Sequence, residues 1–139
     1  MNLRLPVLPL QSAIFARIKA DYPARVVFIY VPGQNQMPPF ITIGGSTAVD
    51  FSTKTSQAYD VSVQIHIWSQ STGNAEVITM ANEALAAISR NLLDLSADDF
   101  RHWQTEIERA DFTVEIGDEI GLIQHGVISM KFGVEDISD

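Results

Sequence analysis

The segment between residues 59 and 92 changes its hydrophobic period half-way along. In Tyr59–Trp68, apolar residues occupy the odd positions, and polar residues occupy the even positions as far as His66. This alternation is typical of a strand that buries one face. From Val77 to Leu92, the apolar residues recur with a helical period and cover about a third of the helical wheel. The segment therefore predicts a strand, a polar turn and an amphipathic helix, on which the rest of the chain can pack.

The boundaries of two helices can be predicted from local signals. Pro9 to Ala20 is expected to form the first helix, with Pro9 at the first helical position, where the missing N–H is not needed. For the helix that follows the central strand, Ser71 or Thr72 is expected to provide the cap, and Glu76 is expected to lie in its first turn.

The stretch between the two helices predicts strands and one exposed loop. Arg25–Val31 is β-branched and aromatic, as short buried strands are, and Pro32–Pro39 is a loop because it contains three prolines and a glycine. Phe40–Ile43 resumes as a strand, and Gly44-Gly45 predicts a bulge, a bend or a close backbone approach. Residues 46–57 are either a long hairpin arm or a mobile loop.

The region from His102 to Ile116 is predicted to be extended, with a change of phase. Trp103, Thr105 and Ile107 lie at odd-numbered positions, whereas the apolar residues from 112 to 116 lie at even-numbered positions. A regular strand would expose one of these sets, so a bulge is expected near Arg109–Asp111.

The C-terminal part predicts a β-hairpin. Gly117-Asp118-Glu119 is a turn, and Leu122–Val134 is the last strand. We expect the ends, residues 1–6 and 135–139, to fray. The order of elements indicates a single α+β domain, residues 1–139. It contains an antiparallel or mixed sheet of about four to five strands, with two helices on one face and the C-terminal hairpin.

Composition excludes several classes of function. The chain has no cysteine, which rules out disulfides and thiolate chemistry. Its net charge is −8 and its basic residues do not cluster, which argues against sequence-specific nucleic-acid binding and against an anionic membrane surface. No apolar run is long enough for a membrane span.

No catalytic, cofactor-binding or metal-binding pattern can be recognised. The three histidines, His66, His102 and His125, have no second ligand at a metal-binding spacing. The carboxylate pairs lie in polar turns, where solvated charge is the usual explanation. We therefore expect a structural protein without cofactor or metal, and not an enzyme.

The stretch VQIHIWSQSTGNAEVITMANEALAAI resembles the tail-completion and tail-terminator proteins of long-tailed bacteriophages, formerly a domain of unknown function. The shared pattern is a strand that ends in Trp-Ser, here Trp68-Ser69, followed by a polar turn and an Ala/Leu-rich helix. The flanks LQSAIFARI, PFITIGG and GVISMKFGV agree with it, so the resemblance extends from about Leu10 to Val134. The segment between Gly44 and Tyr59 matches no motif of the family.

This resemblance implies a structural role in a phage or prophage virion. Proteins of this kind form a hexameric ring at the head-proximal end of the tail tube, end tube polymerisation and present a surface to the head–tail connector. The implied partners are further copies of the chain, the major tail tube protein and the connector. The protein would be made in the cytoplasm of the bacterial host and would be monomeric when dilute.

Three groups of residues are candidates for the subunit or tail-tube interface. They lie in the proline-rich loop, in the polar segment after Gly45, and on the polar face of the central strand: Gln34, Asn35, Gln36, Met37, Pro38; Thr53, Lys54, Thr55; Ser62, Gln64 and His66. Two other functions stay open. One is a different neck or head-completion adaptor, and the other is a small-molecule-binding or enzymatic α+β domain that uses His66.

Overall fold

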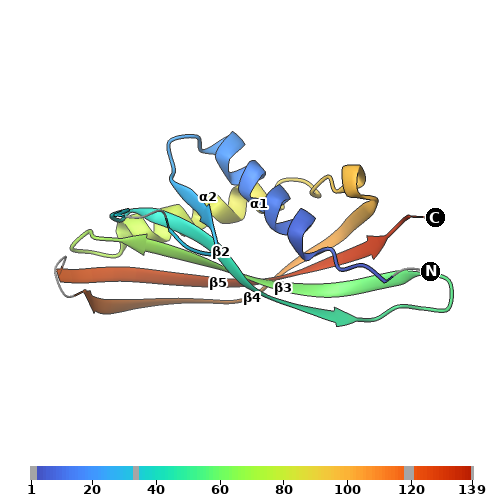
Figure 1. Ribbon diagram of the computed structural model, residues 1–139. Helices are drawn as coiled ribbons and strands as arrows, with labels where there is room; N and C mark the ends of the chain where they lie inside the picture. The colour runs from blue at the N-terminus through green and yellow to red at the C-terminus, as the bar shows by residue number, and fades with distance from the viewer. Residues whose placement is uncertain (1–2, 33–34, 118–120, 139) are drawn as a thin grey trace.

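The computed structural model describes residues 3–32, 35–117 and 121–138 (Figure 1). Its elements, in chain order, are α1 (Val7–Asp21), β1 (Val27–Ile29), β2 (Phe40–Asp50), β3 (Gln57–Ser69), α2 (Ala75–Ser89), the short 3-10 helix η1 (Ser96–Asp98), β4 (Phe100–Gly117) and β5 (Gly121–Asp136).

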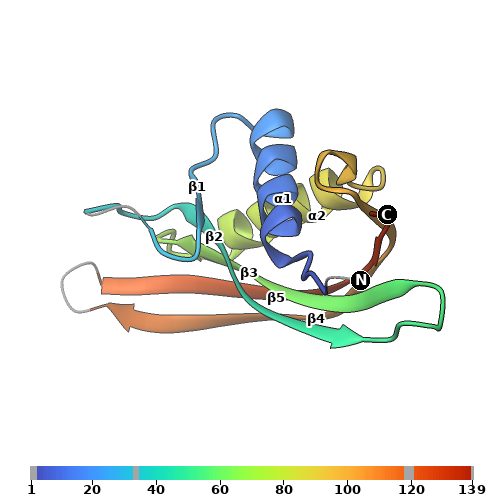
Figure 2. The same cartoon turned by 45° about the vertical axis from the view of Figure 1, so that its right-hand side comes forward.

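The strands form one five-stranded sheet in the order β1-β2-β3-β5-β4. β1 runs parallel to β2, and all other neighbours are antiparallel, so the sheet is mixed. Both helices lie on the same face, and the opposite face carries no helix (Figures 1 and 2). The predicted α+β class with a C-terminal hairpin is confirmed.

β3 lies in the middle of the sheet, with β2 on one side and β5 on the other. Its odd residues from Tyr59 to Ile67 are buried under the helices, as the alternation predicts. Apolar side chains from both helices complete this core, and the fully buried ones include Leu10, Ile14, Ile18, Met80 and Ile88. Because successive side chains of a strand point to opposite faces of the sheet, the even residues of β3 face away from the helices.

Both helices begin and end at positions that differ from the predicted ones. α1 begins at Val7, so Pro9 is its third residue and not its first. α2 begins at Ala75 with Asn74 at the cap position, and neither Ser71 nor Thr72 is close enough along the chain to cap its first amides. Glu76 does lie in the first turn, where its carboxylate accepts a hydrogen bond from Ser69. Leu92 lies beyond the end of the helix and is exposed.

Residues 46–57 complete a hairpin arm, so the first of the two alternatives is correct. Pairing between β2 and β3 continues to Asp50 and Tyr59, with a bulge between Gly44 and Ser46. The register shift confirms the predicted bulge, and Gly45 has a φ of 63° there, which glycine adopts without a steric penalty.

β4 contains two bulges, at residue 103 and at residue 108. The second lies just before the predicted position, and it brings Ile107 and Phe112 to the same face of the sheet. The first was not predicted, and it places Trp103 on the helix-free face, where its ring covers Gly133. The expectation that Trp103, Thr105 and Ile107 share one face is therefore wrong, because the extra residue inverts the alternation after Trp103.

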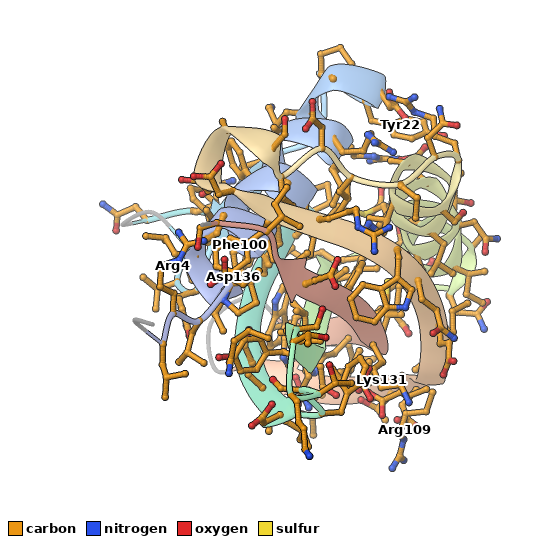
Figure 3. All side chains as sticks on the ribbon, turned by 90° about the vertical axis from the view of Figure 1, so that its right-hand side faces the viewer. Arg4, Tyr22, Phe100, Arg109, Lys131 and Asp136 are labelled. Carbon is orange, nitrogen blue, oxygen red and sulfur yellow. The ribbon has the colours of Figure 1, made fainter. Side chains whose placement is uncertain are left out.

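The two ends of the chain meet at one end of the sheet. β5 extends to Asp136, two residues past its predicted end, and Arg4 Nη2 lies 2.8 Å from Asp136 Oδ1. The Arg4 guanidinium also stacks 4.3 Å from the centre of the Phe100 ring (Figure 3). Fraying of the ends stays a prediction. Asp118 and Glu119 of the predicted turn lie outside the described residues.

Candidate assembly surfaces

The structure places two of the three groups of predicted interface residues at opposite ends of β2. Gln34 lies outside the described residues, whereas Asn35, Gln36, Met37 and Pro38 precede β2. Thr53, Lys54 and Thr55 follow β2, at the other end of an 11-residue strand. At about 3.3 Å per residue, these two groups lie on the order of 30 Å apart. The two groups therefore lie at opposite ends of β2.

The polar side chains of β3 face the helix-free side of the sheet. Ser62 Oγ donates to Glu108 Oε1 at 2.9 Å, across β5. Gln64 is exposed and lies against the bulge, where a side chain on Gly45 would come within 3.1 Å of its amide oxygen. These residues therefore lie on an open, polar sheet face, as the alternation predicts.

His66 belongs to a cluster that the spacing of the histidines does not reveal. Its Nδ1 lies 2.9 Å from Nε2 of His125 on β5, and Nδ1 of His125 lies 3.2 Å from a carboxylate oxygen of Glu115. The Trp68 ring stacks on His125, with 3.8 Å between the ring centres. Burial lowers the pKa of His66, and His125 lowers it further. In the contact between the two rings, one nitrogen donates and the other accepts.

The cluster is held by strand register. Trp68 pairs with His125, and His66 pairs with Val127, so the rings lie on adjacent strands although 59 residues separate the two histidines. Within residues 3–32, 35–117 and 121–138, no three side chains of the His, Cys, Asp and Glu types form a group that could hold a metal ion. The helices in the same ranges include none long and apolar enough to cross a membrane.

An apolar pocket of about 310 Å³ lies beside this cluster. Trp68 and Phe40 form part of its wall, and Gln36 and Pro38 of the proline-rich loop line it as well. The structure thus brings part of the predicted loop group next to the His66 strand. His66 itself does not line this pocket, and the indole N–H of Trp68 is buried without a hydrogen-bond partner in the described part of the chain.

The segment after β2 folds onto β4 and does not project freely. Phe51 packs edge-on against Trp103, with 5.4 Å between the ring centres, and Ser56 Oγ donates to Glu135 at 2.7 Å. Hydrogen bonds from Ser56 and from Arg101 lower the pKa of Glu135. Thr53 lines a pocket of about 390 Å³ at this end, and Lys54 is exposed.

The largest exposed apolar side chains of the sheet form a stripe on the distal half of the β4–β5 hairpin. Strand register places them on the helix side, but β4 is the edge strand of the sheet, and the end of the hairpin reaches beyond the helices (Figure 1). We call this surface the hairpin stripe, and it consists of Ile107, Phe112, Val114, Ile116 and Leu122. Ile116 is 84% exposed and Leu122 is 58% exposed. The change of phase with its expected bulge indicated that Ile107 and the apolar residues from 112 to 116 share one face, but it did not indicate that the face is uncovered.

A second apolar surface lies where the chain begins. Leu3, Leu5 and Leu8 are exposed, and the exposed positions that follow on α1 are Ser12, Ala16 and Ala20. We call these six residues the α1 surface. Leu3 and Leu5 also line a pocket of about 350 Å³ with Tyr59 and other residues of the β2–β3 arm. The sequence did not identify this surface, because the spacing of Leu10, Ile14 and Ile18 indicates only the buried side of the helix.

Comparison with known proteins identifies the family. A family model described as "Tail completion protein gp17" matches residues 12–117. The chain belongs to this family of phage tail-completion proteins. Tail completion protein gp17 of Bacillus phage SPP1 is 23% identical over 139 residues, which cover 98% of this chain and 99% of the relative.

Two solved structures share the fold. One is a chain in the virion of a native gene transfer agent particle, with a TM-score of 0.73, 18% identity, and coverage of 91% of this chain and 94% of that chain. The other is the structure of bacteriophage SPP1 gp17 protein, with a TM-score of 0.60, 21% identity, and coverage of 98% and 96%. The resemblance to phage tail-completion proteins that the strand–turn–helix segment indicates is confirmed, and the chain is a structural phage tail protein.

Proposed function

We propose that this tail-completion protein caps the head-proximal end of the tail tube, stops tube polymerisation and provides the joining surface for the head–tail connector. In this role it acts as a homo-hexameric ring in the virion. The observation that carries the proposal is the family match over most of the chain, from the first helix to the end of β4.

The surfaces of the fold support a ring. A closed ring needs two unlike patches on each subunit, one for each neighbour. The hairpin stripe and the α1 surface are such a pair, because one is formed by strands and the other by a helix and the segment before it. The net charge of −8 suits a channel that DNA passes through, since like charges repel.

Electron microscopy of particles that lack the gene tests this function. We expect tails of unregulated length without heads, and a plasmid copy of the gene should restore normal virions. Tails of normal, regulated length that are still joined to heads would exclude the proposal.

Labelling separates a tail terminator from another neck adaptor. A tagged copy of the protein, marked with gold, should be found at the end of free tails. A label found only on the portal of tailless heads would favour the head-completion adaptor.

A further inference from the structure

Between α2 and β4, residues 90–95 form neither helix nor strand, and side chains from other parts of the chain hold them in place. We call these residues the α2–β4 connection. Its first anchor is Arg17 on α1. The guanidinium of Arg17 donates to the carbonyls of Ala87, Asn91 and Leu92, at 2.9, 3.2 and 3.0 Å. The connection is therefore fixed on the side of α1 by a charged group.

His102 on β4 is the second anchor, and its two ring nitrogens have different roles. The Leu93 N–H lies 2.9 Å from Nδ1. Because a backbone N–H can only donate, Nδ1 is unprotonated, and the neutral ring carries its hydrogen on Nε2. The bulge at residue 103 brings the Gln104 carbonyl to 2.9 Å from Nε2 and the Thr105 hydroxyl to 2.7 Å. The surroundings of the ring thus select one neutral tautomer of His102.

A proton on Nδ1 would weaken both anchors. It turns the acceptor into a donor, so that two N–H groups face each other across 2.9 Å. The His102 residue is only 2% exposed, so water cannot easily replace the lost bond. The charged ring would also repel Arg17. Burial lowers the pKa of His102, the hydrogen bond to Gln104 opposes this, and the positive charge of Arg17 lowers the pKa further.

The surroundings of the ring offer the charged form no compensation. Among the described residues, no carboxylate forms an ion pair with His102. The charged residues next along the chain to these contacts bond to partners other than the ring: Lys19, Asp21, Arg90, Asp94, Arg101, Glu135 and Asp136. Only the neutral ring is therefore compatible with the anchored connection.

The connection can open without the rest of the fold. A segment that has few backbone hydrogen bonds opens at a lower free energy than a central strand. Opening would uncover Leu93 and Leu95, which are 4% and 3% exposed in the closed form. We infer that the α2–β4 connection is a pH-sensitive latch, which is closed while His102 is neutral and opens when a proton on Nδ1 breaks the bond to Leu93 and repels Arg17. This property goes beyond the proposed tail function and does not rest on it.

Amide hydrogen exchange tests whether the latch opens by itself. Protection factors are measured at about pH 7.5 and about pH 5.5, so that the intrinsic pH dependence of exchange is removed. The closed form is favoured fully above the open-form pKa of about 6.5, and this preference is lost as pH falls through the lowered pKa of the closed form. The protection factor of the Leu93 amide should therefore fall several-fold, and by no more than about tenfold. The Ile65 amide in β3 should change less. Equal changes at both amides would overturn the inference, because the connection would then open only with the whole fold.

His102→Asn separates the proton from the hydrogen bond. The asparagine oxygen can accept where Nδ1 does, but the side chain does not titrate. The pH dependence of Leu93 protection should disappear in this variant and persist in the matched control, His66→Asn. Persistence in both variants would exclude the latch. A measurement on the wild-type protein requires no substitution: NMR of the ring nitrogens should find the Nε2–H tautomer of His102 at about pH 7.5, and the Nδ1–H tautomer would contradict the latch.

Arg17→Gln tests the coupling between the two anchors. Glutamine keeps a donor for the carbonyls but removes the positive charge, so the pKa of His102 should rise toward its ordinary value in an NMR titration. Lys19→Gln is the matched control on the same helix, since Lys19 donates to the carbonyls of Pro23 and Arg25. It should leave the pKa of His102 unchanged. The same pKa in both variants would refute the part that Arg17 plays in the latch.

Discussion

The β4–β5 hairpin has a covered half and an open half, although the same two strands form both. Near the chain ends, Phe132 and Val134 are fully buried under the helix layer. Toward the turn, Ile116 and Leu122 point to the same side of the sheet and are exposed. The strands alternate in the same way in both halves. Alternation therefore shows which residues share a face, and the extent of the helices decides which part of that face is core.

Truncating one side chain in each half should show the greatest difference. Phe132→Ala leaves a cavity in the core and should reduce the free energy of unfolding by about 3–5 kcal/mol. Ile116→Ala should change it by less than about 0.5 kcal/mol, because the side chain is mostly in water. Urea denaturation of dilute, monomeric protein measures both. A comparable loss for Ile116→Ala would mean that the distal half packs within the monomer.

A substitution beside the bulge at residue 103 should change the free energy of unfolding by an intermediate amount. Gly133→Ala would place a Cβ 2.7 Å from the Trp103 ring, which would have to move away from Phe51. We expect a loss of about 1–3 kcal/mol, the usual cost of overpacking, and a change in tryptophan fluorescence. Gly73→Ala is the matched control, since nothing lies within 4 Å of its Cβ position. Equal effects of the two substitutions would contradict the position of Trp103 over Gly133.

The stability that the ion pair Arg4–Asp136 contributes should depend on pH more strongly than that of the ion pair Arg109–Asp111. Hydrogen bonds from Arg4 hold the pKa of Asp136 well below its usual range. The stability from this pair is therefore present above the unfolded pKa of about 3.9 and is lost as pH falls through the folded pKa. Asp136→Asn should lower Tm at pH 7, and its difference from wild type should shrink below about pH 4. Asp111→Asn, in the exposed pair with Arg109, should have little effect at either pH.

The smallest effect on Tm is expected from replacing His66, on the helix-free face of the sheet. Since burial and His125 lower the pKa of His66, the neutral ring contributes stability above the unfolded pKa of about 6.5, and this is lost as pH falls through the folded pKa. His66→Gln should flatten the decline of Tm below about pH 6.5, and NMR titration should find a lowered pKa for His66. An ordinary pKa for His66 would mean that its ring is not packed against His125.

Most elements of the fold could be predicted from local patterns. The alternation in Tyr59–Trp68 identified β3 and its buried face, and the helical period after Val77 identified α2. The pair Gly44-Gly45 and a change of phase located two of the three bulges. These features depend on residues close together in the chain, so the sequence contains the information.

The candidate surfaces could be predicted only in part. Ser62 and Gln64 were correctly placed on a polar face, but His66 was considered without His125, because strand register and not sequence spacing brings the two together. The resemblance of one strand–turn–helix segment indicated the family, since its order and spacing are local. Neither apolar surface was recognised, because exposure of Ile116 or Leu8 depends on where distant elements end.

The sequence by itself thus determined the elements, the buried faces and the family of this protein. Only the tertiary structure decided the strand order, the His66–His125 contact, and which apolar residues remain without cover. The physical reason is that a side chain's direction is set by its own strand or helix, whereas its burial is set by the part of the chain that packs over it.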